Sequence, residues 1–151
     1  MKSVAAFFGK KVLREITKEQ LLENICAVRE KCSDRAVLRA LHFFDDNERV
    51  GKEASALSEG DFDAFLSLIN ESGDSSFKYL QNIYASSAPN EQGLSLALYL
   101  AKQALGGEGA CRVHGGGFAG TIQAFVPEKK LEAFKAEMEL SLIHISEPTR
   151  L

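Results

Sequence analysis

Apolar residues recur at helical spacing over most of the chain, and residues that cap helices stand at the breaks. Residues 17–20 match a capping box, so one helix is predicted from there to about Ser33, which can in turn cap the next helix. That next helix is predicted over residues 34–57, with a bend at Gly51 because glycine is a poor helix former. Asp61 is predicted to cap the helix that follows it.

The second half of the chain begins with a predicted turn. Residues 71–76 have the composition of a turn, and Ser75 or Ser76 is predicted to cap a short helix after it. Another helix is predicted over residues 94–105, and a last one after Pro127. The pattern therefore predicts a mainly helical protein with a single readable pair of strands.

A glycine-rich stretch separates the two predicted strands. Four of the six residues from Gly115 to Gly120 are glycine. Residues 121–126 alternate in the way of a strand, and Pro127 then ends the pattern, so the stretch is predicted as strand, glycine turn, strand. Such a turn suits anions, because successive main-chain N–H groups can converge on one negative group.

The surroundings of these glycines exclude better known phosphate loops. Gly115, Gly117 and Gly120 match G-x-G-x-x-G, but the dinucleotide fingerprint needs a helix after it, and a strand is predicted here. No Gly-Lys-Ser/Thr closes a Walker A loop, and the V-A-I-K, H-R-D and D-F-G motifs of protein kinases are absent. A hairpin that only turns the chain stays open as the alternative, although three consecutive glycines exceed what a two-residue turn needs.

Three segments carry a family resemblance. Residues 112–121 (RVHGGGFAGT) resemble the third motif of the kinases named for galactokinase, homoserine kinase, mevalonate kinase and phosphomevalonate kinase, and within that superfamily they resemble galactokinase. Residues 39–50 are similar to a galactokinase helix with a His-Phe-Phe pattern, and residues 68–76 to the segment after it, with Ser-Gly where many members have Ser-His. The resemblance runs over residues 7–140; one departure is Ala119, where members often have glycine.

The resemblance implies an α+β fold, with helices on a small antiparallel sheet, ferredoxin-like and incomplete. It implies that residues 1–140 are the C-terminal part of a galactokinase-like kinase. The candidate site residues that it implies are the substrate- and phosphate-binding loop of Gly115, Gly116, Gly117 and Gly120, with Arg112 and His114 orienting the loop and Ser72 and Ser76 as weaker candidates.

The implied enzyme phosphorylates D-galactose to galactose 1-phosphate with ATP and Mg²⁺, mostly by positioning and charge stabilisation. In this family the sugar motif, the main phosphate loop and the carboxylate near the attacking hydroxyl belong to the N-terminal half. None of them is present, so no residue of this chain is predicted to be catalytic, and the chain alone is expected to be inactive. The alternative is a non-catalytic anion-binding or regulatory module with a galactokinase-like fold.

Two other groups of residues invite a chemical reading. His42 lies between apolar neighbours on a predicted helix, which favours a satisfied residue at the edge of the core over a catalytic one. Asp45, Asp46 and Glu48 could suggest a metal site, but their helical spacing spreads them around the helix, so a solvated face is predicted and no metal ligand is assigned.

Composition limits the partners. The net charge of −3 disfavours a nucleic-acid or anionic-membrane partner, since either would need a basic face. No apolar run is long enough to span a membrane. The cysteines have no metal-binding spacing and are predicted to be reduced thiols of a cytoplasmic protein. They are Cys26, Cys32 and Cys111.

The two ends of the chain give a further expectation. Residues 141–151 break the helical pattern and resemble a translated sequencing adapter, so we expect a non-native tail where the family would have a further strand. The first residues are also expected to follow a cut, because the resemblance begins within a domain. Exposed apolar surface is expected where the missing N-terminal domain would pack.

Overall fold

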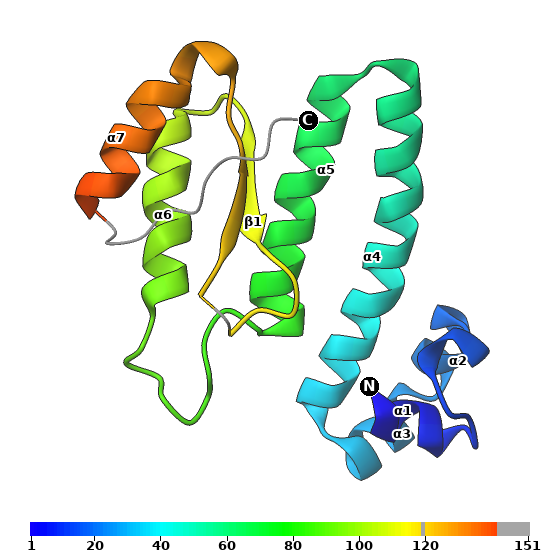
Figure 1. Ribbon diagram of the computed structural model, residues 1–151. Coiled ribbons are helices and arrows are strands. Elements are labelled where there is room, and N and C mark those ends of the chain that lie inside the picture. The colour runs from blue at the N-terminus through cyan, green and yellow to red at the C-terminus, as the bar shows by residue number, and fades with distance from the viewer. Residues whose placement is uncertain (119, 142–151) are drawn as a thin grey trace.

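The computed structural model describes residues 1–118 and 120–141. The fold is α+β, as predicted, with helices on a small antiparallel sheet (Figure 1). The predicted tail at 141–151 lies outside the described residues except for Ser141, the last residue of a helix. The α-helices and strands, in chain order, are α1 (Lys2–Phe7), α2 (Lys18–Glu23), α3 (Ile25–Cys32), α4 (Asp34–Glu59), α5 (Phe62–Ser75), α6 (Gly93–Leu105), β1 (Ala110–Val113), β2 (Ile122–Phe125) and α7 (Leu131–Ser141).

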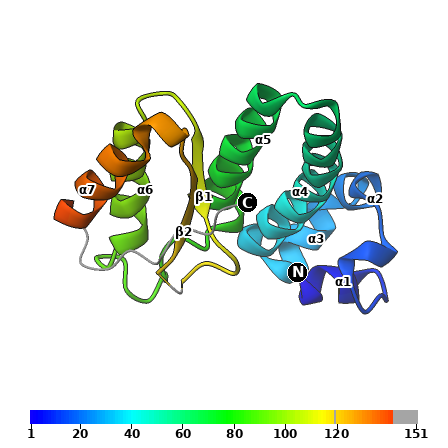
Figure 2. The same ribbon diagram turned by 45° about the horizontal axis from the view of Figure 1, so that its top comes forward.

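The sheet lies between two helical layers, with α4 and α5 on one side and α6 and α7 on the other (Figures 1 and 2). β1 and β2 pair antiparallel, with Ala110 opposite Phe125 and Val113 opposite Ile122. The ring of Phe125 packs edge-on against Phe65 of α5, at 5.3 Å between centroids. The alternate residues of both strands pack toward α6 and α7. The period-2 pattern of residues 121–126 was therefore interpreted correctly as a strand.

Helices α1 to α3 pack around the first turns of α4 and form a separate core there (Figure 1). The capping box at the start of α2 is confirmed, since the Thr17 hydroxyl accepts a hydrogen bond from the Gln20 N–H at 3.2 Å. The single helix predicted from there to Ser33 is wrong, because it breaks at Asn24. The Asn24 side chain donates to the Gln20 carbonyl oxygen at 2.9 Å, and this local bond competes with a continuous helix.

The long helix α4 begins and ends near its predicted limits. The Ser33 hydroxyl accepts from the Ala36 N–H at its start, and Asp61 caps α5 through the Ala64 N–H at 2.9 Å. α4 continues across Gly51, so the local cost of that glycine does not end the helix. Among the described residues, no helix is long and apolar enough to span a membrane.

The predicted turn at residues 71–76 is wrong, because α5 continues to Ser75 and passes directly into a π-helical turn, η2 (Ser76–Leu80). Packing overrides the local preference. An added Cβ at Gly73 would lie 3.1 Å from the Cys111 carbonyl oxygen, so the glycine lets α5 lie directly on β1. Ser72 is fully buried at this contact, and tertiary burial has replaced the turn that its polarity suggested.

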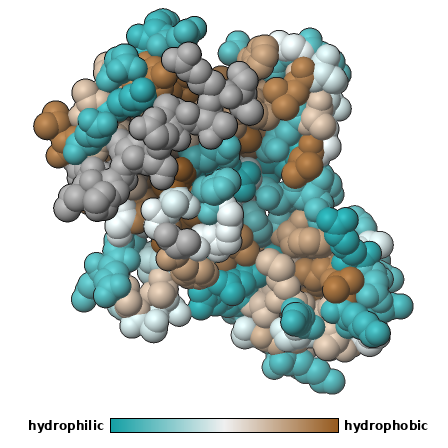
Figure 3. All heavy atoms as spheres, in the orientation of Figure 1, coloured by the Kyte–Doolittle hydropathy of each residue, from teal (hydrophilic) through white to brown (hydrophobic). Residues whose placement is uncertain are grey.

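Some large apolar side chains are exposed. Val50, Leu57 and Phe62 are between 47% and 65% exposed where α4 ends and α5 begins. Figure 3 shows apolar residues on the surface over the same ends of α4 and α5.

Candidate anion-binding loop

The glycine stretch forms the connection between β1 and β2, as predicted. The His114 N–H donates to the Thr121 carbonyl oxygen at 3.1 Å, which continues the strand pairing by one step beyond Val113 and Ile122. The loop that this bond closes therefore projects from the end of a short antiparallel ribbon held between helices. His114 contributes its main chain to the base of the loop, and its side chain is exposed.

The main chain of the loop alternates in conformation. Gly115 and Gly117 take positive φ values of 62° and 72°, and Gly116 between them does not. Alternation of this kind turns successive N–H groups toward one concave side. No acceptor among the described residues bonds to the N–H of these three glycines, and Gly115 and Gly116 are exposed. The loop therefore contains main-chain donors that have no acceptor within the described part of the chain.

The loop rests on Asn82, a residue that the sequence did not single out. The Phe118 N–H donates to the Asn82 carbonyl oxygen at 3.0 Å. A Cβ at Gly117 would lie 2.1 Å from that oxygen and 2.6 Å from the Asn82 amide nitrogen, so only glycine allows this approach. Asn82 lies 36 positions before Phe118 in the sequence, and no local pattern marks the pair.

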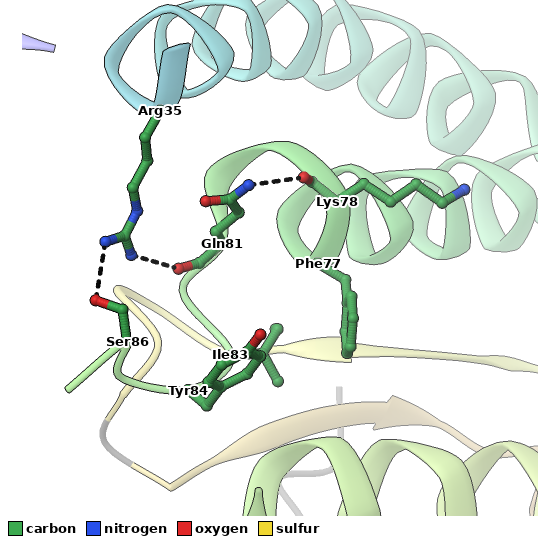
Figure 4. Close-up of a pocket in the computed structure, with 7 residues that line it drawn as sticks. All are labelled: Arg35, Phe77, Lys78, Gln81, Ile83, Tyr84 and Ser86. Atoms are coloured by element: carbon green, nitrogen blue, oxygen red, sulfur yellow. Dashed lines mark hydrogen bonds between the residues drawn. The ribbon is translucent and has the colours of Figure 1, made fainter. Parts of the chain in front are cut away.

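Two arginines of α4 fix the segment that ends in Asn82. The Arg39 Nε donates to the Leu80 carbonyl oxygen at 2.8 Å. The Arg35 guanidinium donates to the Gln81 carbonyl oxygen at 3.4 Å and to the Ser86 hydroxyl at 3.1 Å (Figure 4). These bonds tie the chain before and after Asn82 to α4. They also border an open hollow of about 480 Å³, which is lined by Arg35, Phe77, Lys78, Gln81, Ile83, Tyr84 and Ser86.

The weaker candidates lie away from the tip of the loop. Arg112 sits on β1 with its Cβ beside Gly73 of α5, and its Nε donates to the Val113 carbonyl oxygen at 3.4 Å. Ser72 is fully buried and donates to Asp46 of α4 at 2.7 Å. Ser76 is 1% exposed, and its carbonyl oxygen accepts the Gln81 N–H at 2.8 Å. The fold thus gathers the loop glycines with Asn82 and holds the two serines in helix packing.

A second polar cluster joins α4 to α5. His42 is 5% exposed, and its Nδ1 lies 2.8 Å from the Ser75 hydroxyl. Its Nε2 lies 3.9 Å from the Asp46 carboxylate, which accepts from Arg49 at 2.6 Å and from Ser72. Burial lowers the pKa of His42 below its ordinary value, although the Asp46 charge acts in the opposite direction. The prediction of a satisfied histidine is confirmed.

The same cluster corrects the prediction of a solvated acidic face. Asp46 is only 24% exposed in its side chain and is held by an arginine and a serine, so it belongs to the helix interface. Asp45 pairs with Lys18 at a more exposed position. Among residues 1–118 and 120–141, no three His, Cys, Asp or Glu side chains are grouped in a way that could hold a metal ion.

Together, the fold and the loop define an α+β protein with a glycine-rich hairpin loop whose N–H groups at Gly115, Gly116 and Gly117 have no acceptor among the described residues. No family model matches the chain. It is 34% identical to the galactokinase of Glaesserella parasuis over 131 residues, 32% identical to that of Mannheimia succiniciproducens over 130, and 30% identical to that of Haemophilus influenzae over 131. These matches cover 86% to 87% of this chain and 32% of each relative, so the chain spans about a third of their length. The chain is related to the galactokinases over most of its own length, which confirms the resemblance.

Proposed function

We propose that this chain is the C-terminal part of a galactokinase, an ATP-dependent sugar kinase that forms galactose 1-phosphate from D-galactose. Its role is to supply the glycine loop, in which Gly115, Gly116 and Gly117 face the substrates and Gly120 allows the turn. The observation that supports this role most directly is that the N–H groups of Gly115, Gly116 and Gly117 have no acceptor among the described residues. Fixed donors of this kind stabilise phosphoryl oxygens without reorganising during the reaction.

The phosphates of ATP would contact this chain at the loop. The donors there are neutral main-chain groups, and successive N–H groups in a turn of this kind can converge on a phosphate oxygen. Mg²⁺ would neutralise charge on the phosphates in the complete enzyme. The described residues include no cluster of possible ligands for it, so no residue of this part of the chain is assigned to the metal.

The loop role is tested by titrating the purified chain with inorganic pyrophosphate and following its main-chain amides by NMR. Pyrophosphate carries the phosphate chemistry without a sugar or a base. The Gly115, Gly116 and Gly117 amide signals should shift with a saturable dependence, while the amide signal of Gly51, a glycine within α4, should not. Uniform small shifts across both groups would refute a binding loop.

The kinase role is tested with a chimera. The chain replaces the matching segment of the Glaesserella parasuis galactokinase, and galactose-dependent ADP release is measured. We expect activity from the chimera and none from this chain alone. The alternative, a non-catalytic anion-binding or regulatory module, predicts pyrophosphate binding by the chain together with a folded but inactive chimera.

We further propose that residues 1–140 form the galactokinase-like unit and that residues 141–151 do not belong to it. Deleting residues 141–151 should then leave the urea midpoint of unfolding unchanged. A clear loss of stability would show that the tail belongs to the fold.

A further inference from the structure

We propose that Asn82 is the positioning residue of the glycine loop and that its side-chain amide is a hydrogen-bonding group of the anion-bound site. This inference rests on the proposed function of the loop. It adds to that function a residue from outside the glycine motif, on the segment between η2 and α6.

The first argument is the contact between the two segments. Asn82 is 2% exposed and accepts the Phe118 N–H, and Gly117 lies so close that any side chain there would collide with it. The position of the loop relative to the segment between η2 and α6 is therefore set by its contact with Asn82. A shift of this residue would move the Gly115–Gly117 donors as a unit, because the pairing of His114 with Thr121 holds the other end.

The second argument is the side-chain amide itself. Both its nitrogen and its oxygen are buried and have no hydrogen-bond partner in the part of the chain that the structure describes. Leaving a buried amide unpaired costs about 1–3 kcal/mol, so such groups generally have a partner in the functional state. The nitrogen lies 2.6 Å from the position that a Gly117 Cβ would take, directly beneath the loop. A donor placed there can pair with an anion, or with a loop carbonyl that turns when the anion binds.

The third argument is rigidity. The carbonyl groups of the two residues before Asn82 are held by Arg39 and Arg35, and Arg35 also holds Ser86 beyond it (Figure 4). Gln81 has a positive φ of 54°, which turns the chain sharply out of η2 and places Asn82 under the loop. Because the chain is held on both sides of Asn82, this residue can keep the loop in position without a ligand.

The test separates stability from binding in two variants. Asn82→Ala removes an amide that is unpaired in the described structure, so the urea midpoint should stay the same or rise. Its affinity for inorganic pyrophosphate should fall by about tenfold, the effect of one lost hydrogen bond to a charged group. Asn82→Asp places a carboxylate beneath the loop and should abolish detectable binding at pH 8. Asn90→Ala, at an exposed position, is the control and should change neither quantity.

The outcomes distinguish the two proposals. If the unmodified chain binds pyrophosphate and Asn82→Ala binds it equally well, the role of Asn82 is refuted and the loop function stands. If Asn82→Ala loses stability and affinity together, and NMR shows the loop amides displaced before pyrophosphate is added, the amide is only structural. If the unmodified chain does not bind pyrophosphate, the loop function fails and the inference fails with it.

Discussion

The glycine loop and the His42 cluster are opposite kinds of polar region. The cluster contains a serine, a histidine and an aspartate, the residue types of a catalytic triad, yet His42 and Ser75 are each 5% exposed. The loop contains no reactive side chain at Gly115, Gly116 or Gly117, yet its N–H groups have no acceptor among the described residues.

Residue type and unused hydrogen-bonding capacity therefore indicate different regions of this molecule as candidate sites. In the cluster, Asp46 already accepts from Arg49 and Ser72, and the His42 Nδ1 is already paired. Such a network stabilises one packing of α4 on α5. In the loop, the N–H groups of Gly115, Gly116 and Gly117 have no acceptor among the described residues. Changes in the cluster should therefore affect stability, and changes in the loop should affect binding.

The largest effect is expected from Asp46→Ala. This change removes the nearest acceptor of the Arg49 guanidinium, which is 13% exposed and then keeps only Glu71 at 3.9 Å. It also leaves the buried Ser72 hydroxyl without its acceptor. Removing one partner of a partly buried charge pair should lower the free energy of unfolding by about 2–3 kcal/mol. Urea denaturation followed by circular dichroism measures it. A loss below about 0.5 kcal/mol would show that the cluster is a solvated face after all.

A smaller effect on stability, with a large effect on binding, is expected from Gly117→Ala. The added Cβ would collide with the Asn82 carbonyl oxygen, and the alanine would have to adopt a positive φ. Together these effects should lower the free energy of unfolding by about 1–2 kcal/mol and displace the loop. Pyrophosphate binding should be lost. The matched control is Gly107→Ala, which lies outside the loop and also requires a positive φ, but where no atom lies within 4 Å of the added Cβ. Equal stability and equal pyrophosphate affinity of the two variants would contradict a specific role for the contact between Gly117 and Asn82.

The pH dependence of stability should report on His42. Its pKa in the folded chain is lowered by burial; Asp46 and Asp45 oppose this shift, and Arg49 and Arg112 reinforce it. The unfolded chain therefore takes up a proton first, so stability is complete above about pH 6.5 and falls as the pH is lowered, by at most about 1.4 kcal/mol per pH unit.

Urea midpoints at pH 7.5 and 5.5 measure this loss, and His42→Gln should reduce the difference between them. An unchanged difference in the variant would assign the acid sensitivity to other groups.

The sequence predicted elements well where a local rule governed them, and poorly where distant packing did. The capping box at Thr17, the cap at Asp61 and the hairpin around the glycines follow from neighbouring residues, and each is confirmed. The turn predicted at residues 71–76 failed because the contact of Gly73 with β1 lies 38 positions away in the sequence.

The candidate site likewise has a part that local sequence predicts and a part that depends on distant packing. The spacing of the glycines predicts the loop, whereas nothing in the sequence around Asn82 predicts its contact with Gly117. Its only signal is three-dimensional, a buried amide with no partner among the described residues. Asp46 differs from its neighbour Asp45 for a similar reason, since adjacent residues of a helix face different surroundings.

The smallest effect is expected from Asp45→Ala, which removes the same functional group one residue from Asp46. Asp45 and its partner Lys18 are each about a third exposed in their side chains, so water screens the pair and solvates Lys18 when the partner is lost. The free energy of unfolding should fall by less than about 1 kcal/mol, and pyrophosphate binding should not change. A loss equal to that of Asp46→Ala would mean that charge on this turn of α4, rather than the bonds to Arg49 and Ser72, stabilises the interface. Added salt decides the point: 0.5 M NaCl should abolish the small effect at Asp45 and leave most of the larger effect at Asp46, because screening acts mainly on exposed charges.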